Sequence, residues 1–476
     1  MRLWLSLLAG LLLHSNTVHS KAFNDGLYSI KSGRLDNGLT YILKENGQSS
    51  NAAIFIAIDG GLEQFSCEKQ QVPHVLEHLV FSGNEVYSTA ELRKLFTSRA
   101  GNVRAMTWFG ETYYEIEIHS AYTEFAITSL YDAISKLQFT TKNLSKAKNE
   151  IHSEFGTSEA YVQKLFAPKR AAVDRAIAKL YPHSKIDCTD EMTPERVELT
   201  DVEDAYRKLY KPDNIYVIVV GDIDEEKIRD TLQETFGKLP KSSTTKTSTN
   251  LALNPVSDEE IVALTKPLAV EANVGFVMRA AGYDSVDYPA MDLFRDYLHD
   301  HFNTLIHSKK GEGYKPRVKY DANPYYGHYV ARVETTYNWA KQLNALLKSM
   351  SNDLKMHGIS NEAFETIRKR KILELESKTW ANKEVAKLYK NHRHEIKSGA
   401  MKNLYQYYQN LSYSDFQRTV KKYMSEAPVY YTRRPPTLLQ MGKDVIIAFG
   451  SIFVLGLPFL RFIKKHRQKR MQECGH

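Results

Sequence analysis

Apolar and polar positions recur along the first half of the chain with the periods of strands and helices. Residues 33–43 place an Asn-Gly turn between apolar runs, which predicts a hairpin. Residues 51–59 (NAAIFIAID) predict a strand that leads into Gly60 and Gly61. The same periods predict helices at 89–99, 124–137, 144–178 and 224–236 and strands at 112–118 and 215–220. This mixture of strands and helices indicates an α+β domain.

The second half of the chain repeats this order of elements. Residues 237–255 carry Ser, Thr, Lys and Asn without an apolar period, which predicts a linker at 241–256. The linker would separate a first domain, 21–240, from a second domain, 257–432. Within the second domain the pattern predicts strands at 272–278 and 329–335 and helices at 288–307 and 338–411. We therefore expect two similar α/β-roll domains that arose by a faint internal duplication.

The two ends of the chain carry segments of a different kind. Residues 1–20 combine Arg2, an apolar stretch and a small residue, Ser20, and predict a secretory signal peptide. Residues 445–463 are almost uncharged and mostly apolar, and a basic tail, 464–476, follows them. This pattern predicts a transmembrane helix with a cytoplasmic C-terminus and exported catalytic domains, on the periplasmic or lumenal side of a single-pass membrane protein. The alternative for the apolar segment is a buried core helix.

Composition excludes one class of partner. The chain of 476 residues is 42% hydrophobic and 25% charged, as is typical of globular proteins. Its net charge is +8, but the basic residues beyond position 460 account for most of that surplus. The nearly neutral remainder offers no electrostatic footprint for nucleic acid. Cys67 and Cys188 could form a disulfide in an oxidising compartment, although the sequence leaves open whether they lie close together.

The chemistry of the chain centres on His74, Glu77 and His78. These residues form the pattern H-x-x-E-H on a predicted helix whose other side is apolar. Two histidines four residues apart lie on one face of a helix and could supply two neutral imidazoles to Zn²⁺. A catalytic zinc site needs a third protein ligand and keeps a fourth position for water, which Glu77 would deprotonate. The alternative is a helix with polar residues on its exposed side. The helix that begins near Leu144 offers Glu150, His152 and Glu154 as candidates for the third ligand.

With these residues in place, the chain resembles the insulinase/pitrilysin family of zinc metallopeptidases over residues 26–429. The landmarks of the resemblance are Asp36-Asn37-Gly38-Leu39, His74 to Gly83 (HVLEHLVFSG), Lys211-Pro212-Asp213-Asn214 and Gly221-Asp222-Ile223-Asp224. The resemblance implies two domains of the processing-peptidase-like sandwich and Glu154 as the third zinc ligand. It also implies that two such halves enclose an unfolded peptide, so we expect this single half to form a homodimer or a heterodimer with a related chain.

The chain departs from the family pattern at positions that matter for activity. Ala147 replaces a second glutamate, and Glu150 could take over its supporting role beside the metal. The family's Asn-Ala-x-Thr segment, which binds the substrate backbone, is Arg104-Ala105-Met106-Thr107 here. An Arg and a Tyr seven residues apart usually assist the substrate carbonyl, and the matching positions are His307 and Tyr314. Tyr314 would then act in catalysis, and His307 would contact substrate.

Three hypotheses for function follow. The first is a zinc-dependent endopeptidase that cleaves unfolded or short peptides in an exported compartment, with Glu77 as the general base. The second is a weakly active or inactive homologue that serves as a partner or assembly subunit, which the departures at Arg104, Ala147 and His307 favour and the complete zinc set opposes. The third, a membrane-surface module, explains only the basic tail.

Overall fold

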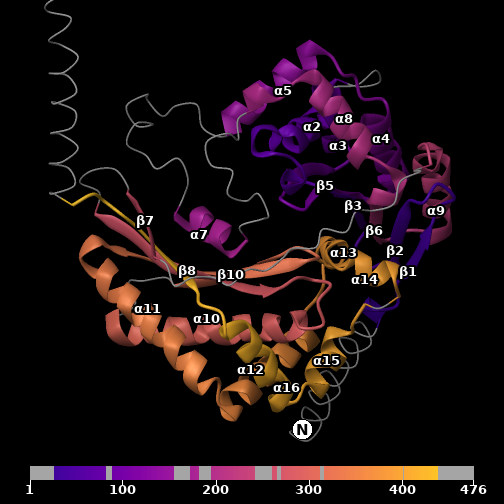
Figure 1. The fold of residues 1–476 in the computed structure, drawn as a ribbon. Coiled ribbons are helices and arrows are strands. Elements are labelled where there is room, and N and C mark those ends of the chain that lie inside the picture. The colour runs from indigo at the N-terminus through magenta and orange to yellow at the C-terminus, as the bar shows by residue number, and fades with distance from the viewer. Residues whose placement is uncertain are drawn as a thin grey trace, which may run out of the picture.

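Two β-sheets, one in each half of the chain, form the framework of the fold (Figure 1). They are seen in a computed structural model, which describes residues 26–81, 88–154, 172–181, 194–241, 260–264, 270–310, 316–399 and 401–437. The prediction of a mixed α/β fold built on two sheets is confirmed.

The first sheet has the strand order β1-β2-β6-β3-β5-β4. β2 and β6 pair in parallel, whereas β3 is antiparallel to both of its neighbours. The strands are β1 (Lys31–Arg34), β2 (Thr40–Glu45), β3 (Asn51–Asp59), β4 (Asn102–Thr107), β5 (Glu111–His119) and β6 (Ile215–Gly221). The helices that share a core with this sheet are α2 (Val72–Phe81), α3 (Thr89–Thr97), α4 (Thr123–Ser135), α5 (Thr141–Glu154), α8 (Leu199–Leu209) and α9 (Glu225–Glu234).

The second sheet repeats this arrangement with the order β7-β11-β8-β10-β9. Here β7 and β11 pair in parallel, as β2 and β6 do in the first sheet. The strands are β7 (Glu260–Leu264), β8 (Glu271–Ala281), β9 (Arg317–Ala322), β10 (Tyr326–Thr336) and β11 (Val429–Arg434). One face is covered by α10 (Tyr288–Lys310), α11 (Tyr337–His357), α12 (Asn361–Ser377), α15 (Leu404–Asn410) and α16 (Tyr413–Met424).

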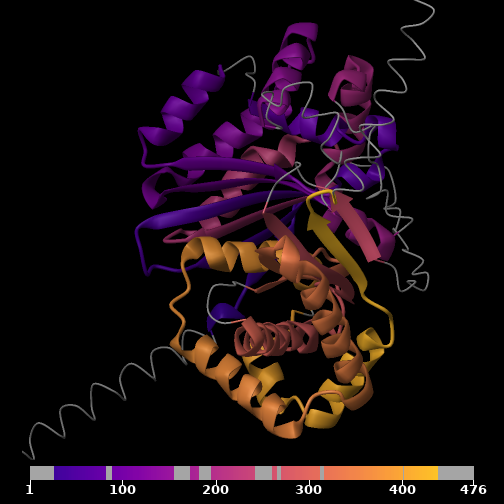
Figure 2. The same ribbon diagram turned by 90° about the vertical axis from the view of Figure 1, so that its left-hand side faces the viewer.

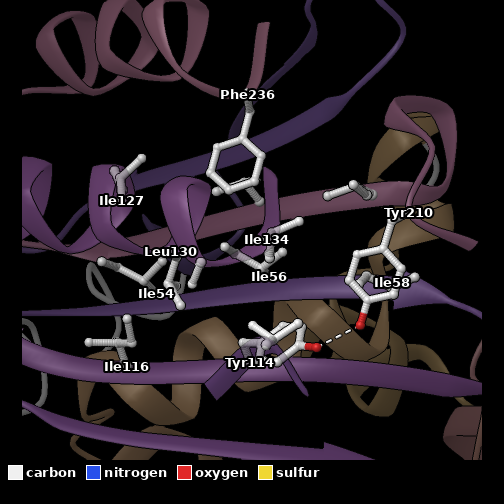
Figure 3. Packing of buried hydrophobic residues seen from close by; sticks show 14 of the residues in the cluster. Ile54, Ile56, Ile58, Tyr114, Ile116, Ile127, Leu130, Ile134, Tyr210 and Phe236 are labelled. Atoms are coloured by element: carbon white, nitrogen blue, oxygen red, sulfur yellow. Dashed lines mark hydrogen bonds between the residues drawn. The ribbon is translucent and has the colours of Figure 1, made fainter. Parts of the chain in front are cut away.

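Strand β3 is buried on both faces, which explains its nearly continuous apolar sequence. Ile54, Ile56 and Ile58 point into the core that the sheet forms with the helices of the first half (Figure 3). In that core the hydroxyls of Tyr114 and Tyr210 share a hydrogen bond of 2.6 Å, so neither polar group is buried without a partner. The alternate residues of β3 point into a second core on the opposite face.

Each half covers the second face of the other half's sheet. Helix α13 (Asn382–Asn391), from the second half, packs against β3 and β6. An orange helix lies directly beneath the purple strands of the first sheet in Figure 2. In return, α7 (Ala172–Leu180) packs against β8 and β11 of the second sheet. Because each half supplies a helix to the other half's core, the two halves are bound together by apolar burial.

Buried ion pairs also join the two halves at the end of β3. Arg393, on the short helix α14 (Arg393–Lys397), is 1% exposed. Its guanidinium donates to Asp59 at 2.7 Å and to Glu111 at 2.8 Å. Lys390 also donates to Glu111. A buried charge is tolerated only when it is paired, so losing one member of this network should destabilise the junction strongly.

The prediction of a single-pass membrane protein is wrong. Among the described residues, no helix is long and apolar enough to cross a bilayer. The longest helix of this part of the chain, α10, has 23 residues but is amphipathic, with Asp292, Arg295, Asp296 and Asp300 along its length. The segment predicted to span the membrane, 445–463, itself lies outside the described residues.

Several predicted features remain outside the part of the chain that the structure describes. These are the signal peptide at 1–20, nearly all of the linker at 241–256 and the basic tail at 464–476. The domain boundaries 21–240 and 257–432 stay predictions. Cys67 is disulfide-bonded, whereas Cys188, its predicted partner, is not among the described residues.

His394 gives the junction between the halves a dependence on pH. Its Nε2 lies 2.9 Å from Asp59 and its Nδ1 lies 2.8 Å from Asp284, so only the protonated ring can donate to both carboxylates. Despite burial, which lowers it, the pKa of His394 is raised overall by the hydrogen bonds to Asp284 and Asp59.

We therefore predict a difference in pH dependence between the wild type and the His394→Gln variant. A histidine whose pKa is raised by folding contributes stability that is fully present below its unfolded pKa, about 6.5, and is lost as the pH rises through the folded value. Urea denaturation from pH 6 to pH 9 should show a steeper loss of stability in the wild type. Parallel curves for the two proteins would show that His394 is not charged in the folded state.

Candidate metal centre

His74 and His78 lie on helix α2, which is packed firmly into the first half. Pro73 suits the first turn of a helix, where its missing N–H is not needed. Val72, Val75, Leu76, Leu79 and Val80 are buried, and the helix packs against α5, α8 and β4. The two histidines, on the other side, are only partly buried. Their ring centroids are 5.0 Å apart, as i and i+4 positions of a helix require.

Helix α5 brings Glu154 to the two histidines. Its Oε2 lies 3.4 Å from His74 Nε2, and its Oε1 lies 3.4 Å from His78 Nε2. One possible ligand atom from each of the three residues lies within 4.8 Å of the other two. It is the one such cluster of histidine, cysteine and carboxylate groups within the described ranges.

The other nitrogen of each imidazole has its own partner. His74 Nδ1 lies 3.0 Å from Gln71 Oε1, and His78 Nδ1 lies 3.2 Å from Glu150 Oε2. Such contacts fix the orientation of a metal-binding imidazole and leave Nε2 for the metal. Glu150 therefore lies beside the cluster, and its supporting role there stays a prediction. Gln71 was not anticipated, although its position directly before α2 and three residues before His74 was a usable signal.

The donor set fits a zinc ion. Burial, with a further contribution from His78, lowers the pKa of His74 to about 4, so this imidazole is neutral at pH 7 as a ligand must be. Two imidazole nitrogens and one carboxylate oxygen match a catalytic zinc site with an open fourth position. The geometry therefore lets His74, His78 and Glu154 hold a metal.

Glu77 lies beside this cluster but is not part of it. Its side chain is buried, at 8% exposure, and burial raises its pKa to about 7. The Thr107 hydroxyl donates to Glu77 Oε2 at 2.6 Å and lies 3.3 Å from the Thr112 hydroxyl. A carboxylate with a pKa near neutral can take up and release a proton in the same cycle.

The backbone of the loop before α2 lies very close to the backbone that follows β4. Gly61 follows β3, and a Cβ at this position would lie 2.0 Å from the Trp108 carbonyl oxygen. The amide of Leu62 donates to that same oxygen at 3.0 Å. The loop before α2 is therefore pressed against the β4–β5 hairpin, which sets the position of Thr107 relative to Glu77.

The other predicted site residues are less closely associated with the cluster. Arg104 is exposed and Ala105 half-buried on the edge strand β4. His307 is exposed on α10, and Tyr314 lies outside the described residues. The rival ligand His152 pairs with Glu195 instead of joining the cluster.

Comparisons of sequence connect this chain to one peptidase family. The family description "Insulinase (Peptidase family M16)" matches residues 40–180. The description "Peptidase M16 inactive domain" matches residues 196–371. The chain therefore carries M16 peptidase domains, and the candidate metal cluster falls within the first match.

Individual relatives are zinc proteases by name. The chain is 25% identical over 218 residues to the "Probable zinc protease PqqL" of Haemophilus influenzae, covering 44% of this chain and 23% of the relative. It is also 25% identical over 211 residues to the "Uncharacterized zinc protease YmxG" of Bacillus subtilis, covering 44% and 50%. The aligned region is thus half or less of the length of these relatives.

Solved structures of similar fold cover more of the chain. A protease from Helicobacter pylori has a TM-score of 0.71 at 17% identity, over 85% of this chain and 99% of its own. The periplasmic protease PqqL from Escherichia coli has a TM-score of 0.65 at 14% identity, over 85% of this chain and 47% of its own. These likenesses establish the M16-like fold.

We predict that the Glu150→Gln variant binds Zn²⁺ more weakly than the wild type. The neutral amide cannot stabilise the Nδ1 proton of His78 as a carboxylate does, and loss of such a partner typically lowers metal affinity by about 10- to 100-fold. Competition with a chromogenic chelator measures the affinity. Glu124→Gln, which removes an exposed carboxylate paired with Lys227, is the matched control and should leave zinc binding unchanged. Equal affinities in Glu150→Gln and the wild type would exclude this role of Glu150.

Proposed function

We propose that this chain, which carries M16 peptidase domains, is a zinc-dependent endopeptidase. The observation that carries the proposal is the convergence of His74, His78 and Glu154 beside a buried carboxylate, Glu77. The first three residues match the ligand set of a catalytic zinc site, and the fourth has the pKa of a general base.

Each residue then has a defined task. His74, His78 and Glu154 hold the metal, while Gln71 and Glu150 keep the two imidazoles in place. When bound, Zn²⁺ supplies Lewis acidity to the scissile carbonyl and to the attacking water. Glu77 takes a proton from the water and passes it to the leaving amine. Thr107 holds one oxygen of Glu77 through its hydrogen bond, which orients the carboxylate for both transfers.

The substrate is proposed to be an unfolded or short peptide. Strand β4 is at the edge of the first sheet and carries Thr107, which touches Glu77. An extended peptide can add to such an edge as a further strand, with backbone hydrogen bonds in place of sequence-specific contacts. Arg104 and Ala105 would flank it. His307 and Tyr314 remain proposed contacts to the substrate carbonyl, with Tyr314 as the catalytic partner of the metal.

A second subunit is part of the proposal. The aligned part of this chain, 85% of its length, covers 47% of the structure of the Escherichia coli protease PqqL. We propose that a second copy, or a related chain, supplies the other half of the enclosure around the peptide. The pairing would limit access to substrates that are flexible enough to enter.

The alternative function is that of a weakly active or inactive partner subunit. Two observations favour it: the match of residues 196–371 to an inactive domain, and the departures from the family pattern at Arg104, Ala147 and His307. Ala147 is fully buried in the core of the first half, on the helix that packs against α2, so this position contributes packing alone. Retention of zinc without peptide cleavage would support this alternative.

The Glu77→Gln variant tests the proposed function. The amide cannot accept a proton, so peptide cleavage should fall by about 10²- to 10⁴-fold, while one zinc per chain is retained. A quenched-fluorescent peptide library reports cleavage, and atomic absorption reports zinc. Glu226→Gln, an exposed carboxylate on α9, is the control and should cleave as the wild type does. Normal cleavage by Glu77→Gln would show that another group is the base.

A further inference from the structure

The open edge of the first sheet lies beside the proposed general base. Strand β4 is the last strand in the order of this sheet, so one of its edges pairs with no other strand of the described chain. Its side chains alternate between two faces. Val103 and Ala105 pack against the core of the first half, and Thr107 donates to Glu77. The odd-numbered residues of β4 therefore face helix α2 and the metal cluster.

The residues between them form a row on the opposite face. This outward row consists of Arg104, Met106 and Trp108, and all three side chains are exposed. Met106 is 42% exposed and Trp108 is 49% exposed, which is unusual for large apolar side chains. Trp108 makes a side-chain hydrogen bond with Tyr113, the residue that lies opposite Met106 on β5, so its ring lies on the same face as Met106.

The hydrogen bonds of the β4–β5 hairpin determine how a further strand would pair. The amide of Trp108 donates to the Glu111 carbonyl at 2.8 Å, so this is a hydrogen-bonded pair. Because such pairs alternate along an antiparallel ladder, the outward row turns its backbone groups toward β5, whereas Ala105 and Thr107 turn theirs toward the open edge. An added antiparallel strand would bond to Ala105 and Thr107. Its residues opposite the outward row would then occupy the positions where side chains of neighbouring strands approach most closely.

Arg104 brings positive charge to this row. Glu115 lies opposite Arg104 on β5, but its carboxylate pairs with Lys383 of helix α13. Lys383 also pairs with Glu117, at 2.8 Å. The guanidinium of Arg104 makes no ion pair or hydrogen bond with any residue that the structure describes. It is thus available to a carboxylate of a bound peptide, and guanidinium–carboxylate hydrogen bonds are among the strong ones.

We propose that the outward row sets the substrate preference of the metal centre: Arg104 selects an acidic side chain, and Met106 and Trp108 select apolar side chains. Because strand residues on one face recur every second position, the acidic and apolar residues of the substrate alternate with a spacing of two. The residues between them face α2. This inference rests on the proposed peptidase function and names its substrate class: extended segments with a carboxylate two positions from an apolar side chain.

Peptide binding to the full-length Glu77→Gln variant, loaded with zinc, tests the preference without cleavage. Two fluorescein-labelled peptides serve as probes, Gly-Asp-Ala-Leu-Ala-Asp-Gly and Gly-Lys-Ala-Leu-Ala-Lys-Gly. Their symmetric spacing presents a charge to Arg104 whichever way the peptide runs, when Leu lies opposite Met106. Fluorescence anisotropy should show that the Asp peptide binds at least about threefold more tightly than the Lys peptide, as expected for an opposite-charge pair across strands. The difference should shrink in about 0.5 M salt, which screens exposed charges.

Point variants in the same background assign the preference to the outward row. Arg104→Gln should abolish the preference for the Asp peptide, and Arg104→Glu should invert it. Arg317→Glu is the matched control, because Arg317 is exposed on β9, the edge strand of the second sheet, and it should leave the preference unchanged. Met106→Gln should weaken both peptides by about two- to fivefold. Met356→Gln, at a 70% exposed position on α11, is its control and should bind both peptides normally.

Cleavage by the wild type separates this inference from the proposed function. Preferential binding of the Asp peptide without cleavage of either peptide would support the outward row and overturn the peptidase function. Cleavage of both peptides with equal kcat/KM would leave the peptidase function standing and overturn the preference. Equal binding of the two peptides, or an unchanged preference in Arg104→Gln, would also overturn it.

Discussion

Burial of strand β3 on both faces is the constraint on which the rest of the structure depends. One face carries isoleucines that need the helices of the first half, and the other needs α13 from the second half. Asp59, the last residue of the strand, pairs with Arg393 and His394 from the second half. The chain then continues through Gly61 to helix α2. The position of α2 therefore follows from the same packing that joins the two halves. A rigid support of this kind is what a catalytic metal site requires of its surroundings.

The metal centre itself depends on a pair of helices that are far apart in sequence. Helix α2 supplies two imidazoles and Glu77, the proposed general base, and α5 supplies Glu154 and the partner of His78. The second half uses the same pair of helices, α10 and α12, for a different chemistry: an ammonium ion from the protein lies between two carboxylates. The two halves thus share a backbone arrangement, whereas the side chains at these positions form a cluster of possible metal ligands in the first half and an internal cluster of ion pairs in the second. The description of residues 196–371 as an M16 inactive domain agrees with this difference.

The features that the sequence predicted are those set by local periodicity. Strand β3 was predicted with its observed bounds, because an apolar run between polar ends and glycines is a local signal. The pair His74 and His78 could be placed on one helix face for the same reason. The cluster with Glu154 required a resemblance, since no local pattern tells which distant carboxylate meets two histidines. The packing of α7 and α13 against the sheet of the other half, and the pairing of Arg393 with Asp59, join segments that are far apart in the sequence, so local periodicity could not predict them.

Anomalous X-ray scattering at the zinc edge, measured on crystals of the full chain grown with Zn²⁺, tests the central claim most directly. The account predicts a peak at about 2.0–2.2 Å from His74 Nε2, His78 Nε2 and a carboxylate oxygen of Glu154, with Glu77 beside it but not bound to it. A peak at His152 and Glu195, or no peak at the three predicted ligands, would contradict a catalytic zinc centre on helix α2.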